Sequence, residues 1–204
     1  MSEKRLNPGP RIHDILARRW SPRAYAATPV EPDKVRACLE AARWAPSCYN
    51  DQPWHFIVAT RDQGDVYDRL LACLADMNQA WAKAAPVLMI SVARTTFTLD
   101  GKPNRHGQHD VGLATMNLMI QAAALGLHAH AMGGFDRDAA RRAFGIPAGF
   151  EPMAAIALGY LGDPATLPDD RRRMEVAPRE RRPMRDWVFG ARWGETSTVA
   201  IAPV

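Results

Sequence analysis

An uninterrupted apolar run near the middle of the chain places the strongest constraint on its fold. Residues 87–93 read VLMISVA, with Ser91 as the one polar side chain, and Pro86 precedes them. A short run of this kind is typical of a strand that is buried on both faces. Residues 111–125 are apolar on nearly every side of a helix, which predicts a helix buried in the core or between subunits. Both features require a layered fold with a substantial core.

Helical and extended patterns alternate along much of the rest of the chain. Apolar residues three or four positions apart predict helices, and short apolar runs between them predict strands. Strands separated by helices indicate an α+β or an α/β sandwich, and the strand order stays open. Helices are expected over residues 12–20, 31–44, 66–77, 79–83, 111–125 and 138–144, and strands over 54–59, 87–93, 128–132 and 153–160.

Both ends of the chain differ from its centre. Met1–Pro10 is polar and contains Pro and Gly, so it is expected to be a flexible arm and not a secretory signal. Residues 162–204 are rich in Pro and Arg and then polar, yet they carry Trp187, Phe189 and Trp193. Large aromatic side chains without a core of their own need a surface to cover. The simplest such surface is a second subunit.

Composition narrows the class of protein. The 204 residues fit a single domain, and no stretch of about 18 apolar residues predicts a membrane span. The net charge of +4 is dispersed along the chain, so nucleic-acid binding is not expected. Three cysteines without a CxxC spacing argue against a disulfide framework and fit a reduced, cytoplasmic setting. No metal site is expected, because the candidate ligands are split between a loop and a strand: His106, His109, Asp110, His128 and His130.

Two basic segments suit a phosphate. The first is Arg19-Trp20-Ser21-Pro22-Arg23, which places two guanidinium groups and a hydroxyl at a helix end broken by proline. The second, residues 179–184 (RERRPM), lies far away in the sequence. Each segment also fits a simpler interpretation: a helix terminus whose arginines complement the helix dipole, and a solvated run of charge.

Two further segments offer polar groups and small residues. Residues 46–54 (PSCYNDQPW) form a loop between two prolines, and their hydroxyl and amide groups match a ring edge with alternating donors and acceptors. Gly133 and Gly134 follow an expected strand and would let the backbone approach a flat ring. The alternatives are a well-ordered turn and an ordinary glycine turn.

Together, and in this order, the four segments resemble the nitroreductase family from about Arg18 to Trp193. The most specific piece is the pattern P-S-x-x-N-x-Q-P-W, complete from Pro46 to Trp54. The resemblance implies a single α+β domain over residues 1–204, a three-layer sandwich with a central, mostly antiparallel sheet. It also implies a homodimer with FMN at the interface and a domain-swapped C-terminal extension, residues 162–204, that wraps the partner subunit.

The resemblance also assigns residues to FMN, none of them as a nucleophile or an obligatory acid. The two basic segments would hold the phosphate and ribityl chain, the loop would come from the partner, and the amide of Gly133 would approach N5 of the ring. Many members carry a second basic residue in place of Trp20 and a glutamate in place of Gly133. The full set is Arg19, Trp20, Ser21, Arg23, Ser47, Tyr49, Asn50, Gln52, Asn78, Gly133, Gly134, Arg179 and Arg181.

The activity implied is an FMN-dependent oxidoreductase. Hydride would pass from NADH or NADPH through FMN to a nitroaromatic, a quinone or a similar small acceptor by a ping-pong mechanism. The chain has no GxGxxG motif, so the nicotinamide is expected to share the acceptor's pocket. Two alternatives stay open: a non-catalytic flavin-binding or storage protein, and a reductase of activated alkenes or semialdehydes. The acceptor, the preferred nicotinamide, the role of Cys48 and a lid over residues 95–108 stay open as well.

Overall fold

The computed structural model describes residues 12–201, so the arm expected over Met1–Pro10 lies outside the described residues. The described chain forms four strands that pair in the order β1-β2-β4-β3, each neighbouring pair antiparallel. The expected α+β class is confirmed, and the pairing supplies the strand order that the sequence left open. The strands are β1 (Trp54–Thr60), β2 (Val87–Arg94), β3 (His128–Met132) and β4 (Phe150–Gly159).

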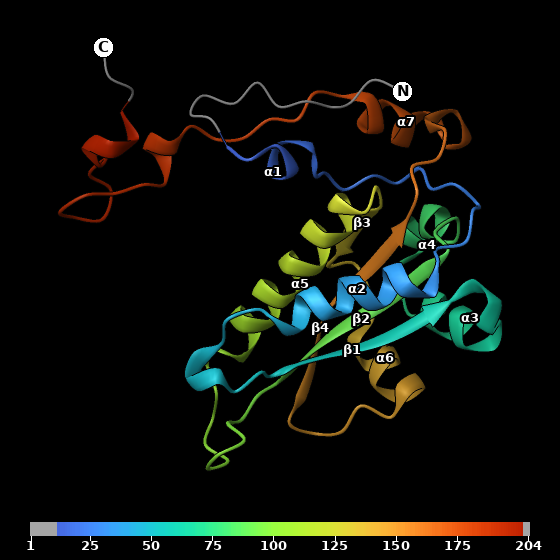
Figure 1. Ribbon diagram of the computed structural model, residues 1–204, viewed down its shortest axis with the longest axis horizontal. Helices are drawn as coiled ribbons and strands as arrows, with labels where there is room; N and C mark the ends of the chain where they lie inside the picture. The colour runs from blue at the N-terminus through green and yellow to red at the C-terminus, as the bar shows by residue number, and fades with distance from the viewer. Residues whose placement is uncertain (1–11, 202–204) are drawn as a thin grey trace.

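Helices cover both faces of this sheet (Figure 1). One layer consists of α2 and α5, and the opposite layer consists of α3, α4 and α6. The remaining helices, α1 and α7, lie beyond one end of the sheet (Figure 1). The helices of the described residues are α1 (Asp14–Arg18), α2 (Pro32–Arg43), α3 (Asp65–Ala72), α4 (Asp76–Ala82), α5 (Gly107–Ala124), α6 (Arg137–Phe144) and α7 (Asp169–Val176).

The side chains of β2 alternate between two hydrophobic cores. Leu88 and Ile90 belong to the core beneath α3, α4 and α6, while Val87 and Met89 belong to the core beneath α2 and α5. Successive side chains of a strand point to opposite faces, so a strand covered on both faces has no polar side. The apolar run in the sequence therefore reflects the place of β2 between β1 and β4.

Strand β4 starts earlier than expected, and its early part contains a proline. The sequence predicts a strand from Met153 onward, but β4 begins at Phe150 and carries Pro152 within it. The pairing with β2 is irregular between Ser91 and Val92, and Val92 lies opposite Pro152. Proline cannot donate to the ladder, so a bulge is where an interior strand can accommodate it.

The helix expected over residues 66–77 is a wrong prediction, since the chain leaves α3 after Ala72 and enters α4 at Asp76. Between them, Leu74 forms an isolated antiparallel bridge with Phe135. The backbone N–H of Ala75 donates to the carbonyl of Gly134 at 3.0 Å. Pairing with the segment after β3 thus replaces helical hydrogen bonds that local spacing alone would have favoured.

The C-terminal segment contains a helix that the sequence did not reveal, α7. Leu167 just before it packs in the core beneath α3, α4 and α6, and Glu175 within it is also buried. Farther along, Trp187 and Trp193 are exposed, at 54% and 92%. Leu167 and Glu175 therefore pack on their own chain, and wrapping of a partner by residues 162–204 stays a prediction. No helix among the described residues combines the length and apolarity needed to cross a membrane.

Candidate cofactor site

The two basic segments meet in space although some 150 residues separate them. They line a polar cavity of about 200 Å³ between the end of α1 and the chain after α7. The first segment contributes Arg19, Trp20, Ser21 and Arg23, and the second contributes Arg179 and Arg181. We call these six residues the arginine cluster. All six were predicted from the sequence.

Positive charge is crowded in the arginine cluster. Burial lowers the pKa of Arg19, and the nearby charge of Arg181 lowers it further. The pKa of Arg179 is lowered by burial and then by Arg19 and Arg181. A phosphate would relieve this repulsion and accept charge-assisted hydrogen bonds from several guanidinium groups.

The backbone around Ser21 is held from the sheet. Nδ1 of His130, on β3, lies 2.8 Å from the carbonyl oxygen of Pro22. Burial lowers the pKa of His130 to about 4, so near pH 7 the ring is neutral and its Nδ1–H donates this bond. Tyr25 also pairs with Leu161, just after β4, as an isolated bridge. Contacts with the end of the sheet therefore hold the first segment of the arginine cluster in place.

Arg179 uses its guanidinium to cap α1. Its Nη1 donates to the carbonyl of Arg19 at 2.6 Å, and its Nη2 donates to the carbonyl of Ala17. These oxygens lie at the C-terminal end of α1, where helical carbonyls lack intrahelical partners and a cation is favoured. Arg179 thus orients Arg19, and direct contact of Arg179 with a phosphate stays a prediction.

Glu175 was missed by sequence reasoning. Its carboxylate accepts hydrogen bonds from the backbone N–H groups of Arg23 and Ala24, at 2.9 Å and 3.0 Å. The side chain is buried, at 2% exposure. In the sequence it is one acidic residue in a charged stretch, and nothing local distinguishes it from the exposed acids nearby.

Gly133 and Gly134 lie at the end of β3 against the start of α4. The Nδ2 group of Asn78 donates to the carbonyl of Gly134 at 2.9 Å. A Cβ atom on Gly134 would lie 2.7 Å from that same nitrogen, whereas one on Gly133 would meet nothing within 4 Å. The structure therefore brings Asn78 to the glycine pair, and a side chain at Gly134 would require the Asn78 amide to move, whereas one at Gly133 would not.

The loop between the two prolines has an unusual backbone. Tyr49, Asn50 and Gln52 have φ angles of 53°, 54° and 51°, in the left-handed region that residues other than glycine seldom adopt. The hydroxyl of Ser47 accepts from the N–H of Gln52 at 3.0 Å and closes the turn. Backbone strain of this kind persists where surrounding contacts enforce it, and it is common at functional sites.

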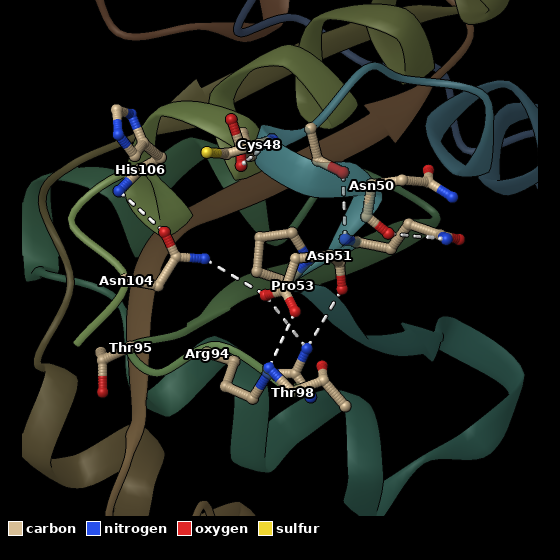
Figure 2. A network of polar contacts seen from close by, with 12 residues as sticks. Cys48, Asn50, Asp51, Pro53, Arg94, Thr95, Thr98, Asn104 and His106 are labelled. Atoms are coloured by element: carbon tan, nitrogen blue, oxygen red, sulfur yellow. Dashed lines mark hydrogen bonds and ion pairs between the residues drawn. The ribbon is translucent and has the colours of Figure 1, made fainter. Parts of the chain in front are cut away.

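Two acids outside the predicted set hold this loop. Asp110, buried in the first turn of α5, accepts from the N–H of Cys48 at 3.1 Å. Asp51 forms an ion pair with Arg94 at 3.2 Å, and Thr98 donates its N–H to the other carboxylate oxygen at 2.8 Å. Figure 2 shows Asp51 at the centre of these contacts.

The Asp51 network also orders the polar excursion after β2. Nδ2 of Asn104 donates to Asp51 at 3.2 Å, and Oδ1 of Asn104 accepts from the N–H of His106 (Figure 2). Burial alone would raise the pKa of Asp51, but the bonds from Thr98 and the Arg94 charge outweigh it and lower the pKa. The loop and residues 97–103 together line a cavity of about 930 Å³. A lid over residues 95–108 stays a prediction.

Two groups of predicted site residues, the loop and the arginine cluster, lie at opposite ends of the molecule (Figure 1). Asn78 and the glycine pair form a third group, between the end of β3 and the start of α4. The loop is tied to the first turn of α5 through Asp110, whereas α1 and the arginine cluster lie beside the other end of that helix (Figure 1). The 18 residues of α5 span roughly 27 Å. One chain therefore does not bring both groups to a single small ligand.

The fold and the arginine cluster define an α+β protein with a small polar cavity lined by arginines. Comparison with known proteins places it more closely. The chain belongs to the nitroreductase family, whose family model matches residues 16–160. An uncharacterised 15.4 kDa protein of Mycolicibacterium smegmatis is 37% identical over 145 residues, which are 68% of this chain and 97% of that protein.

Other relatives carry more informative names. A protein of Archaeoglobus fulgidus, provisionally named NADH dehydrogenase/NAD(P)H nitroreductase, is 30% identical over 157 residues, 73% of this chain and 84% of that protein. A crystal structure described as an oxidoreductase containing FMN superposes with a TM-score of 0.89 at 38% identity, covering 96% of this chain and 99% of that one. A nitroreductase family protein from Clostridium difficile 630 gives a TM-score of 0.68 at 26% identity, covering 88% and 98%. The family and a general oxidoreductase function are thereby supported.

Proposed function

We propose that this protein is an FMN-dependent NAD(P)H oxidoreductase that reduces small acceptors such as nitroaromatics or quinones with ping-pong kinetics. The observation that carries the proposal is the arginine cluster, because three mutually repelling guanidinium groups beside a small polar cavity suit a phosphate monoester. Bound FMN would supply the hydride and electron transfer, which no protein side chain can perform.

The residues present fit both ends of an FMN molecule, the phosphate and the ring. The cavity of about 200 Å³ is of the size of a phosphate group and not of a whole flavin. The glycine pair gives open space beside Gly133, so a planar ring could approach the backbone there without a side chain in the way. Arg19, Ser21, Arg23 and Arg181 would then hold the phosphate, while Asn78 and the amide of Gly133 would face the ring.

A second copy of the chain would complete the site. Ser47 and Asn50 lie at the far end of α5 from the arginine cluster, and their loop is held in a strained shape without any contact to that cluster. In a symmetric dimer the same patch serves both subunits, so each loop could reach the other subunit's cofactor. We therefore propose a homodimer with two composite FMN sites.

The positive charge of the site would favour reduction of the bound cofactor and binding of NADH or NADPH. The cluster is positively charged, and backbone N–H groups near the glycine pair can stabilise negative charge that develops on a bound ring. Donor and acceptor would occupy the same open face in turn, which is the reason to expect ping-pong kinetics. The position of Cys48, half-buried with its N–H bound to Asp110, suits a packing role better than a redox role.

The experiment that tests the proposal is the visible spectrum of the purified protein before and after anaerobic addition of NADH or NADPH. The expected result is an oxidised-flavin spectrum that bleaches and then recovers when a quinone or a nitroarene is added. A bound flavin that never bleaches would favour the non-catalytic flavin-binding alternative. A protein that stays colourless when FMN is supplied would contradict both.

A further inference from the structure

Helix α7 is anchored to the protein by a carboxylate and not by an apolar face. Among the eight described residues of α7, Glu175 alone is buried, while its neighbours Met174 and Val176 are 49% and 62% exposed. A surface helix ordinarily attaches through an apolar stripe at helical spacing, and α7 lacks one. Within α7, the carboxylate of Glu175 is therefore the buried group that connects the helix to the rest of the protein.

That carboxylate binds two successive backbone amides of the phosphate segment. Oε1 accepts from the N–H of Arg23 at 2.9 Å and from the N–H of Ala24 at 3.0 Å, and Oε2 also approaches the N–H of Arg23 at 3.0 Å. Hydrogen bonds to an ionised acceptor are shorter and stronger than neutral ones. A buried charge that lost these partners would be strongly destabilised, so the contact is specific for this geometry.

This contact links the two halves of the arginine cluster. On one side, Glu175 fixes the backbone of Arg23, immediately after Ser21 and Pro22. On the other side, it fixes the end of α7, and only two residues, Ala177 and Pro178, then lead to Arg179. We propose that Glu175 is a positioning residue for the anion site, which aligns the arginines for a phosphate although its own oxygens are engaged by backbone amides.

A positioning role for Glu175 and a purely electrostatic role predict opposite changes in anion binding when the side chain is replaced. Glu175 is a negative charge beside a site for an anion, so its removal should strengthen anion binding if the charge acted only through space. If Glu175 positions the arginines, its removal should weaken binding. The identity of the anion as the FMN phosphate rests on the proposed function, whereas the existence of the aligned anion site does not.

The test is the variant Glu175→Gln, with affinities for FMN and for riboflavin measured by calorimetry on the apoprotein. Riboflavin carries the same ring without the phosphate. We expect the dissociation constant for FMN to rise by about 10-fold or more, and that for riboflavin to change by less than about 2-fold. Equal weakening of both flavins would indicate general destabilisation and would overturn the inference, as would FMN binding that is unchanged or tighter.

The matched control is Glu180→Gln, which removes the same charge next to Arg181 from an exposed side chain. It is expected to leave the FMN affinity unchanged or slightly improved. Should Glu175→Gln fail to fold, Glu175→Asp takes its place, because it keeps the charge but shortens the reach to the two amides. Aspartate is expected to weaken FMN and spare riboflavin, and wild-type FMN affinity in that variant would overturn the inference.

Inorganic phosphate separates this inference from the proposed function. The melting temperature of the wild type should rise in phosphate relative to chloride at equal ionic strength, and the Glu175 variant should lose that rise. If the wild type binds no flavin but shows this difference, the proposed function fails and the role of Glu175 stands. If neither flavin nor phosphate binds the wild type, both are wrong.

Discussion

Asn78 lies directly against Gly134. Its Nδ2 group donates to the carbonyl of Gly134 at 2.9 Å, and a Cβ atom on Gly134 would lie 2.7 Å from that nitrogen. This contact fixes the second glycine of the pair against α4 and leaves the first one facing open space. Because Asn78 lies in the first turn of α4, the contact also holds the start of α4 against the segment after β3.

The first prediction concerns the glycine pair. Gly134→Ala should lower the free energy of unfolding by about 1–3 kcal/mol, because Asn78 must give up its hydrogen bond to make room. Gly133→Ala should change the free energy of unfolding by less than about 0.5 kcal/mol, since nothing lies within reach of its Cβ. Urea unfolding of the two variants checks this, and equal losses would contradict the geometry. The double variant Asn78→Ala/Gly134→Ala should lose less than the sum of its parts.

The second prediction concerns the Asp51 network. The Asp51 side chain is only 5% exposed and binds Arg94, Thr98 and Asn104, so Asp51→Asn should cost about 1–3 kcal/mol. Hydrogen exchange should become faster in residues 95–104 before it does elsewhere. Asp100→Asn is the control, because Asp100 bonds at the surface to the backbone N–H and to the 78% exposed side chain of Lys102, and the change should cost less than about 0.5 kcal/mol. Similar exchange in both variants would mean that Asp51 does not order the excursion.

The third prediction concerns pH. Burial lowers the folded-state pKa of both His128 and His130 from 6.5 to about 4. The unfolded chain then binds more protons than the folded chain between these values, so stability is greatest above pH 6.5 and falls as the pH drops toward 4. Between pH 7 and 5 each histidine should account for about 1–2 kcal/mol. Urea unfolding across this range checks the slope, which His128→Phe should reduce. A flat profile above pH 5 would contradict it.

The fourth prediction concerns the left-handed residues of the loop. The side chain of Tyr49 is 89% exposed and its φ is 53°, so its backbone shape carries a cost that glycine would not have. Tyr49→Gly should be about as stable as the wild type or more so, whereas Tyr49→Val should lose about 1–2 kcal/mol. Both variants remove the aromatic ring, so the difference between their stabilities reports the cost of the left-handed backbone conformation. Equal midpoints in urea would show that the loop relaxes in solution.

The fifth prediction concerns the composite site. Arg19→Ala and Asn50→Ala should each weaken FMN binding, but mixed dimers of the two variants contain one intact site. After subunit exchange, about one quarter of all sites should regain wild-type affinity. The control mixes Arg19→Ala with Arg23→Ala, which affect the same group and should give no recovery. Recovery in the control, or none in the first mixture, would argue against sites shared between subunits.

Several elements could be predicted from local sequence because their cause is local. The run at residues 87–93 is apolar except for Ser91 since β2 is covered on both faces. Helix α5 is buried where it faces the sheet and α2, while Leu113, Met116 and Ile120 are only partly buried, so the burial expected all round α5 is not complete within one chain. The proline-flanked loop and the two basic segments are likewise visible as contiguous residue types. The break between α3 and α4 was not visible, because it depends on pairing of Leu74 with Phe135.

The sequence by itself determined the class of fold, the positions of most strands and helices, and the two basic segments that form the arginine cluster. Only the tertiary structure decided that these segments meet, that the loop lies at the opposite end of α5, and that Glu175 and Asp51 hold them in place. The physical reason is that periodicity and residue type act over a few positions along the chain. The bond from Arg23 to Glu175 spans 152 positions, and a buried carboxylate bound to backbone amides leaves no local pattern.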